Sequence, residues 1–242
     1  MKGPASGGGR WVEVAPERFG GWVERFAERH GTSVNGLTAE VTGRGSAAEA
    51  VTYRAPDGSL AECHPPFPPL EGRPEGGEEP GPAELVARVA QHAGRDRTVA
   101  VLLVRLGGYA AGVFGGSPPR LLASKTGSRL VHGRSAAGGW SQQRFARRRE
   151  KQAAGALAAA GETAAAVFGR YRGRIDVVVL GGDRRAVAAI TGDRRVRAEL
   201  GPYLDLAADR FLTVPEPRFA VLRDTPRLFR SIQIRLTEPG AG

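Results

Sequence analysis

The sequence predicts an α/β fold with two parts: a small N-terminal α+β domain, and a larger domain in which helices pack on a mixed β-sheet. Three patterns support this fold class. A near-continuous apolar run at 98–106 is typical of a strand covered on both faces. Short alternating segments follow it, as in a meander of antiparallel strands. A long helical pattern then leads to a second apolar run at 175–180, which predicts helices packed on a mixed sheet.

The small domain is predicted over residues 10–63, after a disordered tail at 1–9. A strand at 11–14 precedes an amphipathic helix at 16–29. The apolar face of this helix is assigned to the core and consists of Phe19, Trp22, Val23 and Phe26. Strand-like alternation at 33–41 and 49–54, followed by a Pro-Asp-Gly turn at 56–58, completes the predicted domain.

A segment rich in Pro, Gly and Glu follows this domain. Residues 64–82 contain two Pro-Pro pairs, a Gly-Gly and a Glu-Glu, a composition that cannot build a core. We therefore interpret 64–82 as a linker and assign 83–242 to the second domain, which opens with a helix at 83–92.

The order of elements in the second domain follows from periodicity and turn residues. After the strand at 98–106, the Gly107-Gly108 turn leads into the meander. The remaining predicted elements are strands at 109–114, 120–124 and 128–132, a loop at 133–139, a helix at 142–171, a strand at 175–180, a helix at 185–190, and strands at 211–214 and 232–236.

The net charge of +10 and the pI near 10.8 are typical of proteins that bind a polyanion. Only three of the 35 basic residues are Lys, however, and the chain is rich in Ala, Gly, Pro and Arg. That composition indicates GC-rich codon usage, which raises the Arg content without selection for nucleic acid. Composition alone therefore leaves RNA binding open, and the positions of the charges decide.

Several functional classes find no support in the sequence. It has no apolar run of about 18 residues and no secretory signal at its N-terminus, so we expect a cytoplasmic protein without a membrane partner. The single Cys63 excludes an internal disulfide and is too few for a thiolate zinc site. The four His show no ligand spacing, and we expect neither a metal nor a cofactor.

The segment 138–151 is the most informative stretch of the chain. A diglycine is followed by Trp140, Ser141 and an amide pair, and then by a helix whose first two turns are dense in cations. Ser141 is placed to cap this helix. On a helical wheel Arg144, Arg147, Arg148 and Lys151 fall on one side, opposite the apolar stripe. Because cations three and four residues apart repel each other, this row predicts a bound anion such as phosphate.

At these residues the chain resembles the catalytic middle domain of eukaryotic and archaeal class I release factors. In that family a Gly-Gly-Gln loop is followed by an Arg-Phe-Ala-Arg helix, and here Gly133-Arg134 and Gly138-Gly139-Trp140-Ser141-Gln142-Gln143 precede Arg144-Phe145-Ala146-Arg147-Arg148-Arg149. More closely, the sequence resembles the actinobacterial branch of the Vms-like release factors, ribosome-rescue proteins described as peptidyl-tRNA hydrolases. The resemblance covers roughly 97–236 and implies the RNase H-like topology of the release-factor middle domain.

The loop departs from the Gly-Gly-Gln pattern, and two alignments of it are possible. Aligned on Arg144-Phe145, Trp140 stands where release factors have Gln; aligned on Ser-Gln, Gln142 does. Because tryptophan has no amide, we assign the functional amide to Gln142, with Gln143 as the alternative.

The resemblance implies hydrolysis of the ester between nascent peptide and tRNA on stalled large ribosomal subunits. The chain has no room for a separate stop-codon-reading domain, so we expect rescue rather than termination. The implied partners are the rRNA of the large subunit and peptidyl-tRNA, not DNA, and we expect a monomer. The catalytic residues implied are Gly138, Gly139, Ser141, Gln142 and Gln143. The RNA-binding residues implied are Arg134, Trp140, Arg144, Arg147, Arg148 and Lys151.

Two other functions remain open from the sequence. The same loop can belong to an endonuclease that cuts near the tRNA 3′ end, although metal-dependent cutting needs a carboxylate cluster. The Asp residues of the second domain are scattered, and Asp183 is best explained as the cap of the following helix. Alternatively, the loop is a non-catalytic wedge of an rRNA-binding factor, which would tolerate Gln142→Ala.

Overall fold

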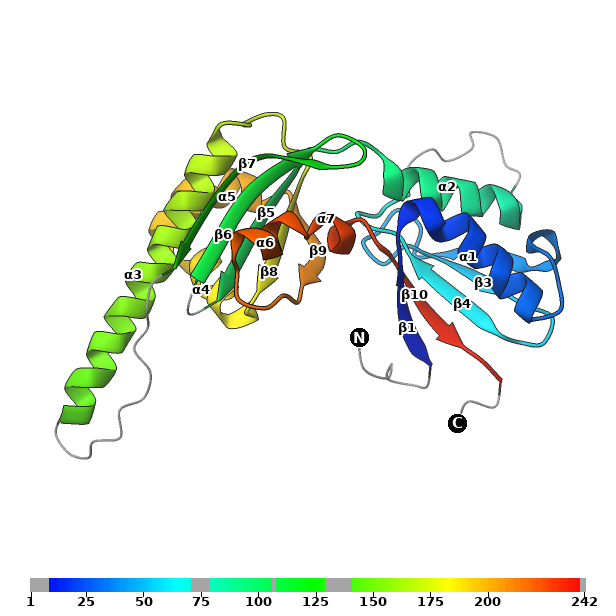
Figure 1. The fold of residues 1–242 in the computed structure, drawn as a ribbon, viewed down its shortest axis with the longest axis horizontal. Helices are drawn as coiled ribbons and strands as arrows, with labels where there is room; N and C mark the ends of the chain where they lie inside the picture. The colour runs from blue at the N-terminus through cyan, green and yellow to red at the C-terminus, as the bar shows by residue number, and fades with distance from the viewer. Residues whose placement is uncertain (1–8, 71–78, 106–107, 129–140, 240–242) are drawn as a thin grey trace. The chain divides into compact units, whose positions relative to one another are not determined.

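The computed structural model describes residues 9–70, 79–105, 108–128 and 141–239, with the side chains of 141–154 excepted (Figure 1). The chain forms two compact units. Unit 1 comprises Met1–Arg95 and Arg227–Gly242, and unit 2 comprises Asp96–Pro226. Each unit has a five-stranded sheet and its own hydrophobic core.

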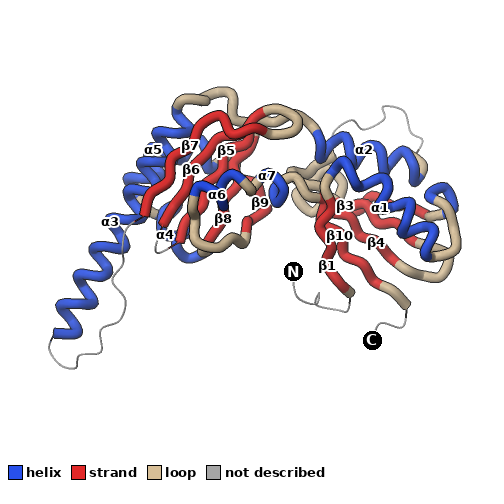
Figure 2. The backbone as a smooth tube through the Cα atoms, in the orientation of Figure 1, coloured by secondary structure: helices blue, strands red, loops and turns tan. Residues whose placement is uncertain are grey.

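Unit 1 is an antiparallel sheet whose strand order is β1-β10-β4-β3-β2. Helices α1 and α2 cover one face of it (Figure 2). The elements are β1 (Arg10–Val14), α1 (Pro16–Arg29), the 3₁₀ turn η1 (Val34–Gly36), β2 (Thr38–Thr42), β3 (Ala50–Arg54), β4 (Leu60–His64), α2 (Pro82–Gly94) and β10 (Ile232–Thr237). The predicted apolar face of α1 lies in the core, with Phe19, Val23 and Phe26 fully buried and Trp22 partly so.

Several elements of unit 1 differ from their prediction. The segment expected as one strand at 33–41 begins with η1, and only its second half joins the sheet as β2. Helix α2 packs in this core through Leu85 and Val89, and β10 pairs with β1 and β4, although the sequence assigned both to the second domain. Periodicity shows which face of an element is apolar but not which core covers it.

Part of the predicted linker also packs on unit 1. Leu70 is buried, and its backbone N–H donates to Glu49 at 3.3 Å. The His92 ring lies within hydrogen-bond distance of the backbone oxygens of Pro66 and Phe67, at 2.9 and 3.1 Å. Residues 65–70 therefore form a packed loop, and 71–78 lie outside the described residues.

Unit 2 has the strand order β7-β6-β5-β8-β9, with β5, β6 and β7 antiparallel and β8 and β9 parallel to β5. This is the predicted mixed sheet of RNase H-like topology, so the fold class is confirmed. The elements are β5 (Val99–Arg105), β6 (Gly108–Gly115), β7 (Arg120–Ser128), α3 (Ser141–Gly169), β8 (Val177–Gly182), α4 (Arg184–Gly192), α5 (Arg194–Leu204), β9 (Ala207–Leu212) and α6 (Phe219–Arg223). The chain passes from unit 2 to unit 1 in α7 (Pro226–Phe229), of which only Pro226 belongs to unit 2.

The prediction for unit 2 was wrong in three places. The strand expected at 120–124 continues to Ser128 as β7, and the strand expected at 128–132 lies outside the described residues beyond Ser128. The last strand of this sheet, β9, begins four residues before the predicted 211. Helix α5 was not predicted, because three Arg, an acidic cap and an internal Pro202 hide its apolar positions Val196 and Leu200.

The strand-to-helix turn after β8 has a steric cause. Gly182 has a φ of +102°, and a Cβ there would overlap the backbone of Val104 on β5. Only glycine accepts this conformation without strain. Asp183 then caps α4 as predicted, since its Oδ1 accepts from the backbone N–H of Ala186 at 2.8 Å.

Candidate functional site

The candidate site is carried by the N-terminal part of α3. The helix has 29 residues, and it packs on the sheet of unit 2 only through its C-terminal part, while its N-terminal part extends past the sheet (Figure 1). From Ser141 to Ala160, the first buried residue of its described side chains, the helix rises about 28 Å. The end of α3 that follows the predicted loop thus stands well away from the core.

The C-terminal part of α3 is held by a face of small residues and one aromatic. Ala160, Ala164, Val167 and Phe168 are buried in the core of unit 2, as the helical wheel predicts. The Phe168 ring makes an edge contact with Tyr203, with centroids 5.6 Å apart. Thr163 donates from Oγ1 to the Tyr109 hydroxyl at 3.3 Å. These contacts anchor one end of the helix and set the direction of the other.

Gly161 allows α3 and α5 to approach each other closely. A Cβ at Gly161 would overlap the side chain of Val196 on α5. Glycine in a helix interior costs roughly 0.5–1 kcal/mol relative to alanine, so its presence here is explained by packing. The contact lies where the buried part of α3 begins, and α5 therefore supports the base of the extended part.

The structure places the predicted site residues only in part. Arg134, Gly138, Gly139 and Trp140 lie outside the described residues. The others lie on the N-terminal turns of α3, where the backbone is described and the side chains are not: Ser141, Gln142, Gln143, Arg144, Arg147, Arg148 and Lys151. The helical placement of residues 142–151 agrees with the prediction, whereas Ser141, predicted to cap the helix, is its first residue. The individual roles of these residues stay predictions.

The charge of the chain is concentrated in the unit that contains α3. Unit 2 has 22 Lys and Arg against 11 Asp and Glu, whereas unit 1 has 13 against 14. Both units share one codon usage, so a compositional bias toward Arg cannot by itself account for an excess confined to one of them. The positions of the charges therefore favour a polyanionic partner for unit 2.

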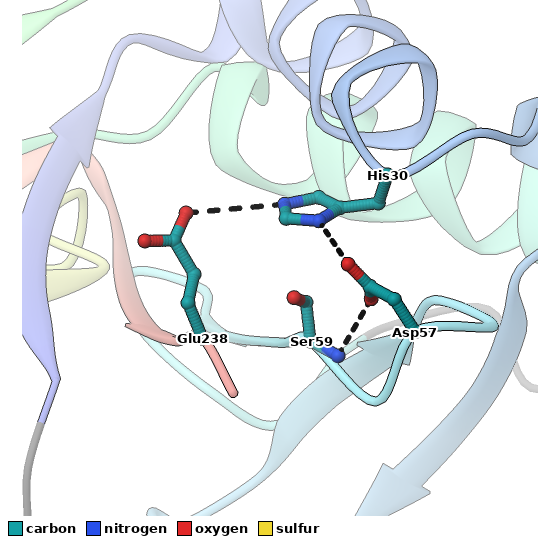
Figure 3. Close-up of polar contacts among 4 residues, drawn as sticks. All are labelled: His30, Asp57, Ser59 and Glu238. Carbon is teal, nitrogen blue, oxygen red and sulfur yellow. Dashed lines mark hydrogen bonds and ion pairs between the residues drawn. The ribbon is translucent and has the colours of Figure 1, made fainter. Parts of the chain in front are cut away.

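A polar cluster of His30, Asp57, Ser59 and Glu238 connects separate segments of unit 1 (Figure 3). Asp57 accepts from the backbone N–H of Ser59 at 2.9 Å and lies 2.7 Å from Nδ1 of His30. Nε2 of His30 lies 3.9 Å from Glu238, just after β10. The hydrogen bond from Ser59 and the contact with His30 hold the pKa of Asp57 below its usual value. The cluster links the C-terminal end of α1 to the β3–β4 turn and to the chain beyond β10.

The described residues offer neither a metal site nor a membrane span. They contain no group of three or more His, Cys, Asp or Glu side chains able to hold a metal ion. Cys63 is buried, and burial raises the pKa of its thiol. None of the helices in the described ranges is both long enough and apolar enough to cross a membrane.

Comparison with known families matches residues 97–235 to the Actinobacteria/chloroflexi VLRF1 release factor family. The chain belongs to this release-factor family. The match begins two residues before β5 and ends within β10, so it includes every strand of the unit 2 sheet and the whole of α3. Membership assigns the chain a role of the release-factor type in translation. Comparison with curated proteins finds no match.

Solved structures with a detectable likeness include a crystal structure of an archaeal translation termination factor, at 11% identity and a TM-score of 0.39. A second, titled only as an archaeal protein, has 13% identity and a TM-score of 0.36. The matches cover 74% and 72% of this chain but only 51% and 48% of those chains, so the chain spans about half of their length. The RNase H-like fold of unit 2 follows from its strand order.

Proposed function

We propose that this release-factor family member hydrolyses the ester bond of peptidyl-tRNA and so frees nascent peptide from stalled large ribosomal subunits. The observation that carries the proposal is the sequence Gly138-Gly139-Trp140-Ser141-Gln142-Gln143 at the start of a helix that extends far beyond its sheet. Family membership and the cationic charge of unit 2 support it.

The length of α3 suits a reaction inside a narrow recess of the ribosome. A rise of about 28 Å between Ser141 and Ala160 lets the loop enter such a recess while the sheet stays outside. Gly138 and Gly139 let the backbone approach the substrate closely, because they have no side chain to exclude it. Gln142 lies in the first turn of α3, where the backbone N–H groups have no partner within the helix.

The chemistry proposed is attack of water on the ester carbonyl. The Gln142 amide, or that of Gln143, orients the water, and a backbone N–H of the loop stabilises the oxyanion. One such donor is worth about 3–4 kcal/mol of transition-state stabilisation. The bond from the carbonyl carbon to the ribose oxygen breaks, the peptide leaves as a carboxylic acid and the ribose regains its hydroxyl.

RNA phosphates position the loop in this scheme. Arg144, Arg147, Arg148 and Lys151 follow the amide pair along one side of α3, and Arg134 precedes the loop. Contacts to phosphate fix orientation without reading sequence. Trp140 stacks on a base or packs beneath the loop, and its substitution separates these two roles.

The test is peptide release from purified stalled 50S–peptidyl-tRNA by wild type, Gln142→Ala and Gln143→Ala. We expect Gln142→Ala to lower the release rate about 100- to 1,000-fold, the range for removing one critical polar group at a transition state, with binding retained. Gln152→Ala, on the same helix, is the matched control and should release peptide normally. Normal release by both loop variants would refute a catalytic amide and favour the non-catalytic wedge.

A further inference from the structure

A second group of cations lies on α4 and α5, outside the residues assigned above. Arg184 and Arg185 open α4, and Arg194, Arg195 and Arg197 lie on the first turns of α5. All five side chains are exposed. We call this group the α4–α5 arginine surface.

These arginines are not neutralised within the described part of the chain. None of the five forms an ion pair there, whereas Arg218 pairs with Glu216 and Arg223 with Asp224 in the same unit. One guanidinium, that of Arg184, lies 4.3 Å from the centre of the Phe211 ring, a contact that orients it but leaves its charge unpaired.

The nearby carboxylates are already engaged with the backbone. Asp183 caps α4, and Asp193 accepts from the N–H groups of Arg195 and Val196 at 2.9 and 3.0 Å. The free donors of both helix ends are thus partly filled by the chain itself. What remains available to a ligand is the set of guanidinium groups, and arginines at this end of a helix also oppose its dipole. A bound anion would pair with the guanidinium groups and would also offset their unfavourable interaction with the helix dipole.

The arginine surface lies beside α3. Val187, Ile190, Val196 and Leu200 pack in the same core as the buried part of α3. Val196 contacts α3 at Gly161, one residue beyond the start of that buried part. Figure 1 shows α4 and α5 on the same side of the sheet as α3. Arg144 and Gly161 are separated along the helix by about 26 Å. The helix backbone at Arg144 therefore lies about that far from the point where α5 contacts α3.

We propose that the α4–α5 arginine surface binds the phosphate backbone of the same RNA that α3 approaches. The proposal rests on the proposed function for the identity of that RNA, and on the structure for the surface itself. Guanidinium groups form paired hydrogen bonds to phosphate, and several such contacts hold an RNA without reading its sequence. Unit 1, made with the same codon usage, has no comparable excess of cations.

The test compares two fourfold variants of the full chain with equal loss of charge. The first variant combines Arg185→Gln, Arg194→Gln, Arg195→Gln and Arg197→Gln. The control combines Arg18→Gln, Arg25→Gln, Arg29→Gln and Arg54→Gln, at exposed positions of unit 1. Affinity for stalled 50S–peptidyl-tRNA is measured over a range of salt, with peptide release at saturating protein measured in parallel. Circular dichroism confirms that both variants are folded.

We expect the first variant to bind at least tenfold more weakly and the slope of log affinity against log salt to lose about 3 units, since each phosphate contact contributes roughly 0.7–0.9. Release at saturation should be unchanged, and the control should bind as wild type does. Lys at the same four positions should restore most of the salt slope, because it keeps the charge, but only part of the affinity, because it cannot form the paired hydrogen bonds of a guanidinium group. Unchanged affinity and slope in the first variant would overturn the proposal.

Two further outcomes separate the possible partners and the two proposals. If the first variant loses affinity for intact 50S but not for purified tRNA or rRNA, the surface contacts an acidic protein and the RNA assignment is overturned. If it loses affinity while even wild type releases no peptide, the arginine surface stands and the proposed hydrolysis fails.

Discussion

The two units of this protein share a plan and differ in charge. Each is a five-stranded sheet with helices packed on it. In unit 1 the acidic and basic residues nearly balance, and several arginines are paired, as Arg44 is with Glu79, Arg230 with Glu17 and Arg235 with Glu62. Unit 2 has twice as many basic as acidic residues and also contains α3. The difference favours unit 2 as the part of the chain that would bind a polyanion.

The largest effect expected is the loss of stability when one large buried side chain is removed from the core of either unit. Phe168 in unit 2 and Phe26 in unit 1 are both buried, and replacing either by Ala should lower the free energy of unfolding of its own unit by about 3–5 kcal/mol. Thermal unfolding followed by circular dichroism measures the loss. Peptide release should fall with Phe168→Ala as unit 2 unfolds. Loss of release in Phe26→Ala while unit 2 remains folded would show that unit 1 shares the function.

A smaller effect is expected where α3 meets α5. Gly161→Ala should destabilise unit 2 by about 1–3 kcal/mol, because the added methyl overlaps Val196. At Gly192, the last residue of α4, nothing lies within 4 Å of an added Cβ, and Ala there should stabilise by up to about 1 kcal/mol. Chemical denaturation of both variants measures whether each substitution lowers or raises the free energy of unfolding.

Val196→Ala in the Gly161→Ala background should recover part of the lost stability, since it removes the overlapping atoms. A stabilising Gly161→Ala would mean that the two helices do not approach each other as described, and the support for the extended part of α3 would have to be sought elsewhere.

The smallest effect concerns the acid stability of unit 1. Hydrogen bonding lowers the pKa of Asp57 below its usual 3.8, so its contribution to folding is complete above that value and is lost as the pH falls through the lower pKa of the folded state. The Tm difference between wild type and Asp57→Asn should therefore shrink on acidification below about pH 4. A difference that stays constant down to about pH 2 would contradict this assignment. Asp209→Asn in unit 2 is the matched control.

The sequence was most informative where local signals agree. Helix α1 has a proline at its first position and a clear apolar face, and its predicted bounds match the structure. The predicted cap and turn after β8 are present because Gly182 and Asp183 act locally. By contrast, the strand β10 and the helix α2 were assigned to the wrong core, since their partners lie far away in the sequence.

In the candidate site too, local features could be predicted from the sequence, whereas those that depend on the fold could not. That a long helix begins near Gln142 could be predicted from periodicity, and α3 begins at Ser141. The identity of the loop came from its resemblance to release factors, not from any spacing of catalytic groups. The arginines of α5 were missed because α5 itself was not predicted, and only the fold brings α4 and α5 together beside α3.

The most direct test of the account is the chemical identity of what wild-type protein releases from stalled 50S–peptidyl-tRNA. Peptide and tRNA from one reaction are separated, and the tRNA 3′ end is analysed by sequencing and mass. Ester hydrolysis predicts a peptide with a free carboxyl group and a tRNA with an intact CCA end. A peptide that still carries nucleotides, with a shortened tRNA, would contradict hydrolysis and make the protein an endonuclease.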